Sequence, residues 1–95
     1  MIAVVATLVA KEGHEAQLEA VAGELAAKVR ANEPGCLLYI LCKADAPRTY
    51  MFLERYQDQA AIEAHRKTDH FRTLGRQLGE HLDGPPTIAR LTVVA

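Results

Sequence analysis

Apolar residues in the first third of the chain follow two different repeats, and each repeat predicts a different element. Residues from Ile2 to Ala10 are apolar on both faces of a two-residue repeat, which predicts a strand covered on both sides. From about His14 to Ala31 the apolar residues recur at helical spacing instead, at Leu18, Val21, Ala22, Leu25 and Val29. Pro34 disfavours helical geometry at Glu33, so we expect this helix to end there.

Two further strands are predicted after that helix. The segment from Cys36 to Lys43 is again apolar on both sides, with Leu37, Tyr39 and Leu41 on one side and Cys36, Leu38, Ile40 and Cys42 on the other. The short connection at residues 44–48 predicts an antiparallel hairpin with the strand that follows. On that third strand, one face carries Tyr50, Phe52, Glu54 and Tyr56.

The rest of the chain predicts helical segments and a final strand. Asp58 is a suitable N-cap for a helix from Gln59 to about Lys67, and Thr68 or Asp69 can cap a second one. An Asp-Gly-Pro-Pro sequence ends that helix, and Thr87 to Val94 is rich in β-branched residues. The order β-α-β-β-α-β predicts one α+β domain over residues 1–95, a ferredoxin-like antiparallel sheet with its helices on one face.

The predicted helices can cover only one of the two faces of the predicted sheet. The first two strands are apolar on both sides, so a monomer would expose a large apolar patch. A second copy of the chain that presses its own sheet against this face would cover it, which predicts a homodimer.

Composition and charge narrow the range of partners. The 95 residues contain 11 Lys and Arg and 12 Asp and Glu, interspersed along the chain, so no basic stripe indicates nucleic-acid binding. No apolar run approaches the ~20 residues that a membrane-spanning helix needs, and no leader pattern is evident. We therefore expect a cytoplasmic protein whose partner is a small molecule or another copy of itself.

The two cysteines are expected to be free. Cys36 and Cys42 are six residues apart in a predicted strand, which would separate them by roughly 20 Å, too far for a disulfide. Without a Cys-x-x-Cys spacing they are also poor metal ligands. We expect both to pack as small apolar side chains.

Several short motifs together resemble a known family. They are Asn-Glu-Pro-Gly-Cys at 32–36, Glu54-Arg55-Tyr56, Asp58, and His65 followed by Asp69-His70-Phe71. Over almost its whole length the chain is similar to the antibiotic biosynthesis monooxygenase family, and within it to small quinol monooxygenases. The resemblance implies a dimeric α+β barrel. Because cofactor-free monooxygenases, haem-degrading enzymes and isomerases share this scaffold, the fold alone does not select an activity.

Differences from the branches of that family bear on the chemistry. The haem-degrading branch carries an Asn, a Trp and a haem-ligating His where this chain has Ala6, His65 and Gly75, so the resemblance argues against haem degradation. The polyketide-oxidising branch carries an Asn or another polar residue at the position of His65, in a cavity between helices and sheet. His65 is therefore the first candidate, although the Trp of that cavity is absent, because the chain contains no Trp.

No cofactor is expected. The chain has no dinucleotide fingerprint, no P-loop and no histidine pair at metal-binding spacing, since His65 and His70 are five apart and would diverge on a continuous helix. An oxygenase without metal or flavin needs a substrate that itself donates an electron to molecular oxygen. A small aromatic substrate such as a hydroquinone or a polyphenol has this property once it is deprotonated.

The resemblance and the residue types together suggest roles in such a site. His65 is the candidate base, and Tyr56 the candidate hydrogen-bond donor to the developing phenolate. The candidate substrate-binding residues are Tyr39, Phe52, Phe71 and Arg90.

The same residues also have plain structural explanations. A lone His on a helix is often a solvated side chain, and buried Tyr and Phe often serve core packing. Two other functions therefore stay open: a non-catalytic dimeric binder of a small aromatic metabolite, and an isomerase or cyclase on the same scaffold. Oxygen consumption with a panel of hydroquinones separates the monooxygenase from both.

Overall fold

A computed structural model describes all residues 1–95 and confirms the predicted α+β ferredoxin-like fold. Two short helices stand where the pattern indicated helical segments after the third strand, so the order is βαββααβ. The elements are β1 (Ile2–Val9), α1 (Glu15–Asn32), β2 (Cys36–Lys43), β3 (Thr49–Tyr56), α2 (Gln59–Lys67), α3 (Asp69–Gly79) and β4 (Thr87–Thr92).

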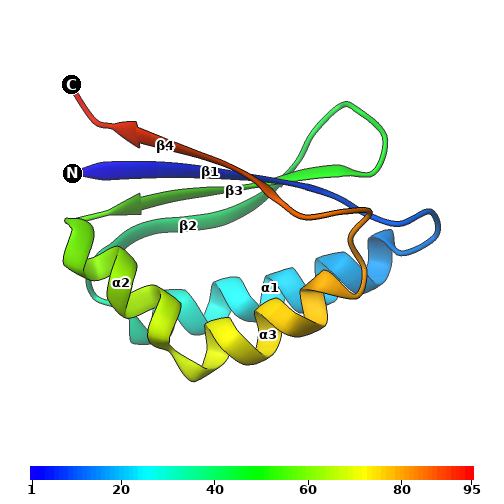
Figure 1. Ribbon diagram of the computed structural model, residues 1–95, viewed down its shortest axis with the longest axis horizontal. Coiled ribbons are helices and arrows are strands. Elements are labelled where there is room, and N and C mark those ends of the chain that lie inside the picture. The colour runs from blue at the N-terminus through cyan, green and yellow to red at the C-terminus, as the bar shows by residue number, and fades with distance from the viewer.

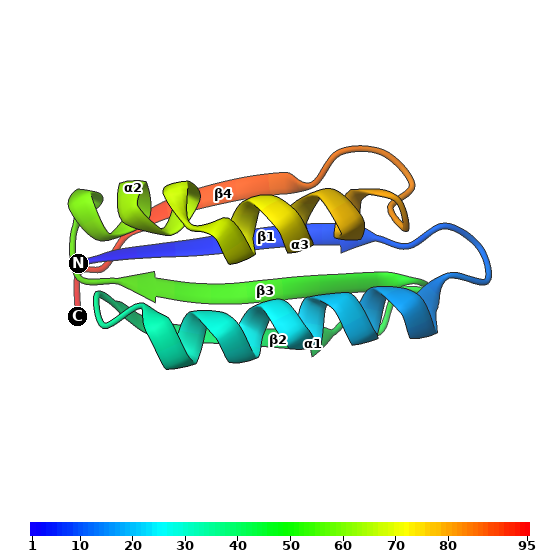
Figure 2. The ribbon, with the colours of Figure 1, turned by 90° about the horizontal axis from the view of Figure 1, so that it is seen from below.

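The four strands form one antiparallel sheet in the order β2-β3-β1-β4. All three helices lie on the same side of it, as Figure 1 shows edge-on. Seen from the helix side, α1 runs along the β2 and β3 half of the sheet, while α2 and α3 lie over the β1 and β4 half (Figure 2). The α1 helix and the α2–α3 pair therefore meet above the middle of the sheet.

Helix boundaries follow from local capping. The Asp58 side chain accepts a hydrogen bond from the Ala61 N–H and so starts α2, and Thr68 does the same for the Phe71 N–H at the start of α3. Glu33 at the end of α1 has φ −119° and ψ 88°, a non-helical geometry consistent with the following Pro34, which disfavours the helical region. The break at Thr68 lets α3 leave α2 in a new direction.

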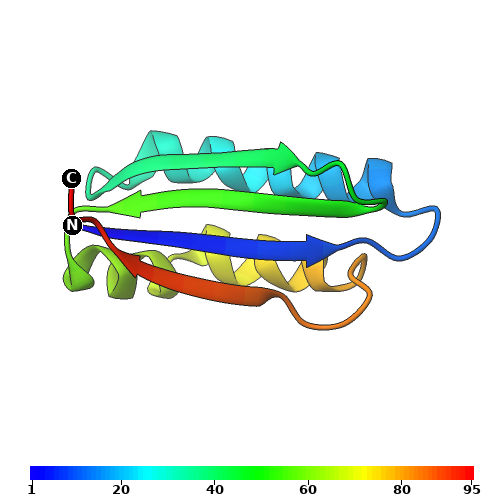
Figure 3. The same ribbon diagram turned by 90° about the horizontal axis from the view of Figure 1, so that it is seen from above.

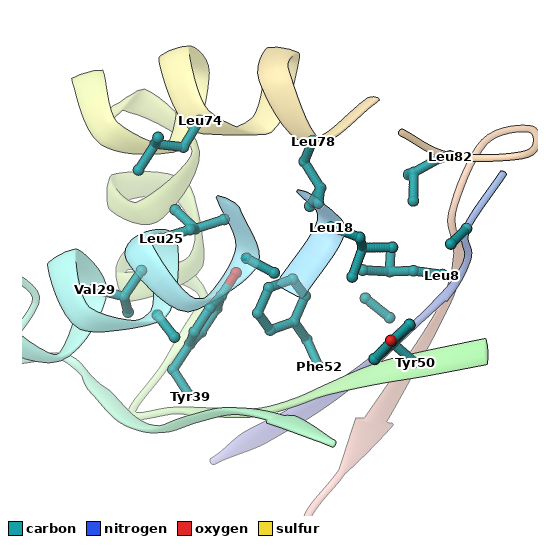
Figure 4. Close-up of a cluster of buried hydrophobic side chains, with 14 residues drawn as sticks. Leu8, Leu18, Leu25, Val29, Tyr39, Tyr50, Phe52, Leu74, Leu78 and Leu82 are labelled. Atoms are coloured by element: carbon teal, nitrogen blue, oxygen red, sulfur yellow. The ribbon is translucent and has the colours of Figure 1, made fainter. Parts of the chain in front are cut away.

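The core fills the space between the helices and the sheet. Its largest fully buried side chains come from α1 and from the inner face of the sheet: Leu8, Leu18, Leu25, Val29, Tyr50 and Tyr56. Figure 4 shows how side chains of α1 and α3 point toward those of β1, β2 and β3. The predicted inner face of β3 is confirmed, because Tyr50, Phe52, Glu54 and Tyr56 are all buried.

The predicted faces of β2 were partly wrong. The β2–β3 register shifts between Cys36 and Leu38, so that Cys36 lies opposite Tyr56 and packs against the core, while Leu37 is exposed. A bulge of this kind adds one residue to a strand and moves the preceding side chain to the other face. Both cysteines are free, as expected, and half-buried.

The outer face of the sheet carries no helix, as Figure 3 shows. Strand pairing brings three apolar residues side by side at its centre, with Leu53 of β3 between Ile40 of β2 and Val5 of β1. Exposed apolar side chains elsewhere on the strands include Val9, Leu38 and Leu91. The predicted apolar outer face is therefore present. None of the helices has the length and hydropathy needed to cross a membrane.

Candidate functional site

A cavity of about 340 Å³ lies between the inner face of the sheet and the helices. Of its 18 lining residues 12 are hydrophobic, so its walls are mostly apolar. The polar side chains that line it are few and include Glu54, Tyr56, His65 and Arg66. An apolar space with a small number of polar groups is the usual form of a small-molecule site.

His65 is one of the titratable groups at the wall of this cavity. It is 4% exposed, and its ring lies among three aromatic rings, with centroid distances of 4.6 Å to Phe71, 5.3 Å to Tyr39 and 5.6 Å to Tyr56. Its Nδ1 lies 2.9 Å and 3.1 Å from the two carboxylate oxygens of Glu33. Because Nδ1 is engaged in this way, Nε2 is the ring nitrogen that is available to a ligand.

Glu33 also binds His70, which corrects one inference from the sequence. The Oε2 atom of Glu33 lies 2.5 Å from Nε2 of His70, so the two histidines converge on one carboxylate. Their divergence was predicted for a continuous helix, but Thr68 separates α2 from α3 and turns His70 back toward the end of α1.

The turn after α1 sets the position of this cluster. Pro34 keeps Glu33 out of the helical geometry at the end of α1, and the Gly35 carbonyl accepts a hydrogen bond from the Gln57 N–H, just before α2. Gly35 also lies so close to Ala61 of α2 that a side chain there would collide with it. The Glu-Pro-Gly sequence thus brings the end of α1 against α2.

A second polar pair lies on the adjacent strand. The Tyr56 hydroxyl donates a 2.6 Å hydrogen bond to Oε1 of Glu54, and both residues are buried. Burial raises the pKa of the Glu54 carboxyl to about 7, and the charge of Glu33 adds to this effect, while the Tyr56 hydrogen bond opposes it. Glu54 therefore titrates near neutral pH.

Burial also changes the titration of the neighbouring rings. Desolvation lowers the pKa of His65 below its usual value, although the Glu33 carboxylate acts in the opposite direction. Burial and the charge of Glu54 raise the pKa of Tyr39 and of Tyr56 well above the ordinary range. At neutral pH the site therefore contains a neutral imidazole and two neutral phenols.

The structure brings most of the sequence candidates together. His65, Tyr56, Tyr39, Phe52 and Phe71 lie around one cavity, as their assignment to a single site requires.

Arg90 is the exception among the candidates. It lies opposite Val4 on β4, an edge strand on which every residue is exposed, and it does not line the cavity. Ile88 of the same strand lines the cavity instead.

Three polar residues of the site were missed from the sequence. Glu33 was noted only within the Asn-Glu-Pro-Gly-Cys motif, without a role of its own, and Arg66 lies next to His65 without any pattern of its own. Glu54 had a visible signal, because it is the one acidic residue on the inward face of β3. No group of three or more His, Cys, Asp or Glu side chains is arranged to hold a metal ion.

Comparisons with known proteins agree with the fold. The family model described as antibiotic biosynthesis monooxygenase matches residues 1–77. A solved structure of a proposed antibiotic biosynthesis monooxygenase from Caulobacter crescentus is 41% identical and superposes with a TM-score of 0.94, over 99% of this chain and 90% of that one. No match is found among curated proteins.

Two other solved structures are similar over nearly the whole length. A protein from Pseudomonas aeruginosa is 32% identical with a TM-score of 0.89, and the match covers 99% of this chain and 94% of that one. A protein from Mycobacterium tuberculosis is 26% identical with a TM-score of 0.91, over 99% and 95% of the two chains.

Proposed function

Since this chain belongs to the antibiotic biosynthesis monooxygenase family, we propose that it is a cofactor-independent monooxygenase acting on a small hydroquinone or polyphenol. One oxygen atom of O₂ enters the aromatic ring and the other leaves as water, so a hydroquinone yields a hydroxyquinone. The substrate supplies the electrons, and the protein supplies a base, hydrogen-bond donors and a dry enclosure.

The observation that carries this proposal is the state of His65. It is buried beside an apolar cavity, its Nδ1 is held by Glu33, and its lowered pKa keeps the ring neutral near pH 7. A neutral imidazole with a free Nε2 is suited to take the proton of a phenol. The phenolate that forms is the electron-rich species that reacts with oxygen.

Tyr56 and Glu54 support the polar end of the substrate. Tyr56 keeps its proton, because its pKa is raised, and its hydroxyl orients the Glu54 carboxyl through their hydrogen bond. In its protonated form Glu54 still accepts from Tyr56 at Oε1 and has a proton on Oε2 to donate. That donor would stabilise negative charge that develops on a substrate oxygen.

The cavity favours a substrate with one polar edge and an apolar body. Its polar residues come from the end of β3 and from α2. The wall farther along β1 and α3 is apolar and includes Leu8 of β1, Leu78 of α3, Leu82 and Pro86 of the following connection, and Ile88 of β4. A hydroxyl of the substrate would lie near His65, and the carbon skeleton would extend toward Leu82. Aromatic rings of Phe52 and Phe71 would pack on its faces.

The proposal is tested by oxygen uptake with a panel of hydroquinones. We expect turnover in the parent protein and a loss of ~10² to 10⁴ in rate for His65→Ala. His81→Ala is the matched control, because His81 pairs with His14, does not line the cavity and should leave turnover unchanged. Binding of the hydroquinones without oxygen uptake would instead identify a binding protein.

A second candidate function rests on the same acid and base. A neutral His65 and a Glu54 that stays protonated up to about pH 7 form an acid and base pair at one cavity, which is what proton-transfer isomerisation requires. Anaerobic conversion of an enolisable carbonyl compound, absent in both His65→Ala and Glu54→Gln, would favour the isomerase.

We also propose a homodimer, formed through the outer face of the sheet. Leu53 and its cross-strand neighbours Val5 and Ile40 form an apolar centre that no element of the same chain covers. The same face of a second copy, related by two-fold symmetry, would cover it.

A further inference from the structure

The Glu33 carboxylate joins the buried base to the protein surface. His65, Glu33 and His70 have side chains that are 5%, 8% and 15% exposed, in that order from the cavity outward. His70 lines a polar groove between α1 and α3, together with Glu24, Lys28 and Asp69. The three residues therefore connect an apolar cavity to a solvated groove.

The geometry determines which nitrogen of each ring carries a proton. An ionised carboxylate only accepts hydrogen bonds, so His65 donates from Nδ1 and His70 donates from Nε2. For neutral His65 the basic atom is then Nε2. For His70 the free nitrogen is Nδ1, on the side of the ring that Glu33 does not occupy.

We propose that Glu33 is a positioning residue that holds His65 as the Nδ1–H tautomer, and that His70 releases a proton to water in the α1–α3 groove when His65 takes one from the substrate. The proton-exchange part rests on the proposed function of His65 as a base, whereas the tautomer part stands without it.

The proton transfer balances in charge. The O–H bond of the phenol breaks, the Nε2–H bond of His65 forms, and His65 becomes a cation beside Glu33. When His70 is also a cation, two positive rings share one carboxylate, so the Nδ1–H bond of His70 breaks and its proton passes to water in the groove. With His65 neutral and His70 a cation at the start, the summed charge of the three side chains is zero before and after the step.

Other charged groups face each histidine. Arg66 lies near His65 and lowers its pKa, as the charge of His70 does, while Glu33 raises it. His70 faces Glu33 on one side and the groove residues Glu24, Lys28 and Asp69 on the other. Glu33 is thus the one carboxylate that contacts both rings.

The test is nuclear magnetic resonance of the histidine side chains in the full chain, without substrate. In the parent protein we expect ¹⁵N shifts of the Nδ1–H tautomer for His65. Glu33→Ala should mix the tautomers and lower the His65 titration midpoint by about 1 pH unit or more. His70→Gln should raise that midpoint by about 0.5 pH unit, since a neighbouring positive charge is removed.

Opposite shifts from two neighbouring substitutions distinguish this arrangement from a merely structural role. His81→Gln is the control and should leave the His65 signals in place. Should Glu33→Ala fail to fold, Glu33→Gln keeps an acceptor for Nδ1 and should still lower the midpoint, because the negative charge is lost.

Several results would overturn the proposal. An Nε2–H tautomer in the parent protein, or unchanged His65 signals in both Glu33 variants, would exclude the positioning role. An unchanged midpoint in His70→Gln would exclude the exchange role. A parent protein that takes up no oxygen with any hydroquinone refutes the proposed function and its proton-exchange step, while the resonance data decide the tautomer independently.

Discussion

A β-carbon added to Gly35 would lie 2.8 Å from the β-carbon of Ala61, closer than such atoms approach in proteins. The contact joins the turn after α1 to the first turn of α2. The last turn of α2 carries His65. We expect Gly35→Ala to push α2 away from the turn and to reduce the free energy of unfolding by about 1 to 3 kcal/mol. Urea unfolding measures the change.

Two variants make the Gly35 experiment specific. Gly23 lies exposed within α1 with no atom in the path of a side chain, so Gly23→Ala should stabilise the protein by about 0.5 to 1 kcal/mol. Ala61→Gly in the Gly35→Ala background should recover part of the loss. Equal losses with and without Ala61→Gly would mean that this contact does not position α2.

Glu54 should make the stability depend on pH. Its pKa rises from 4.5 to about 7 on folding, so the folded state holds a proton that the unfolded state has released. The contribution is fully present below pH 4.5 and is lost as the pH rises through about 7. Relative to the parent, Glu54→Gln should therefore gain up to about 3 kcal/mol between pH 5 and pH 8. Parallel stability curves for the two proteins would contradict this.

The oxygenase rate should pass through a maximum with pH. It should rise as His65 loses its proton, with an apparent pKa below 6.5, and fall as Glu54 ionises near pH 7. In Glu54→Gln the fall should disappear while the rise is kept. Stopped-flow or electrode measurements of kcat/KM across pH 5 to 9 check both limbs, and a fall that persists in Glu54→Gln would remove Glu54 from the mechanism.

A charge at the centre of the outer sheet face should disrupt the dimer. Leu53 pairs with Val5 on one side and Ile40 on the other, so Leu53→Glu buries a carboxylate among apolar side chains if a second copy covers them. Sedimentation at micromolar concentration should change from dimer to monomer. Gln17→Glu on the exposed side of α1 serves as the control. A parent protein that sediments as a stable monomer would refute the dimer.

Gly75 should determine the room for the substrate. It lines the cavity within α3, where glycine weakens the helix, and a side chain added there meets no atom within 4 Å. Gly75→Ala should stabilise the protein by about 0.5 to 1 kcal/mol. Gly75→Leu should fill part of the cavity and raise KM for the larger hydroquinones, with Gly23→Leu as the matched control. Unchanged KM values would place the substrate elsewhere.

Local patterns in the sequence were sufficient for the elements and for most of the cavity wall. The two-residue repeat of β3 put Tyr50, Phe52 and Tyr56 on the inner face, because alternate side chains of a strand point the same way. Asp58 and the Pro34-Gly35 pair marked helix boundaries for equally local reasons. His65 was singled out by the family resemblance, which places a polar residue at its position in a cavity between helices and sheet.

The tertiary structure alone decided which polar groups meet. Glu33 is 32 residues from His65 and 37 from His70, and no spacing rule relates such positions. Their contact depends on the break between α2 and α3 and on the close approach at Gly35. The side of Cys36 depended on a bulge, and Arg90 lies outside the cavity although Ile88 of the same edge strand lines it. These features arise from packing between distant segments, which a repeat along one segment does not encode.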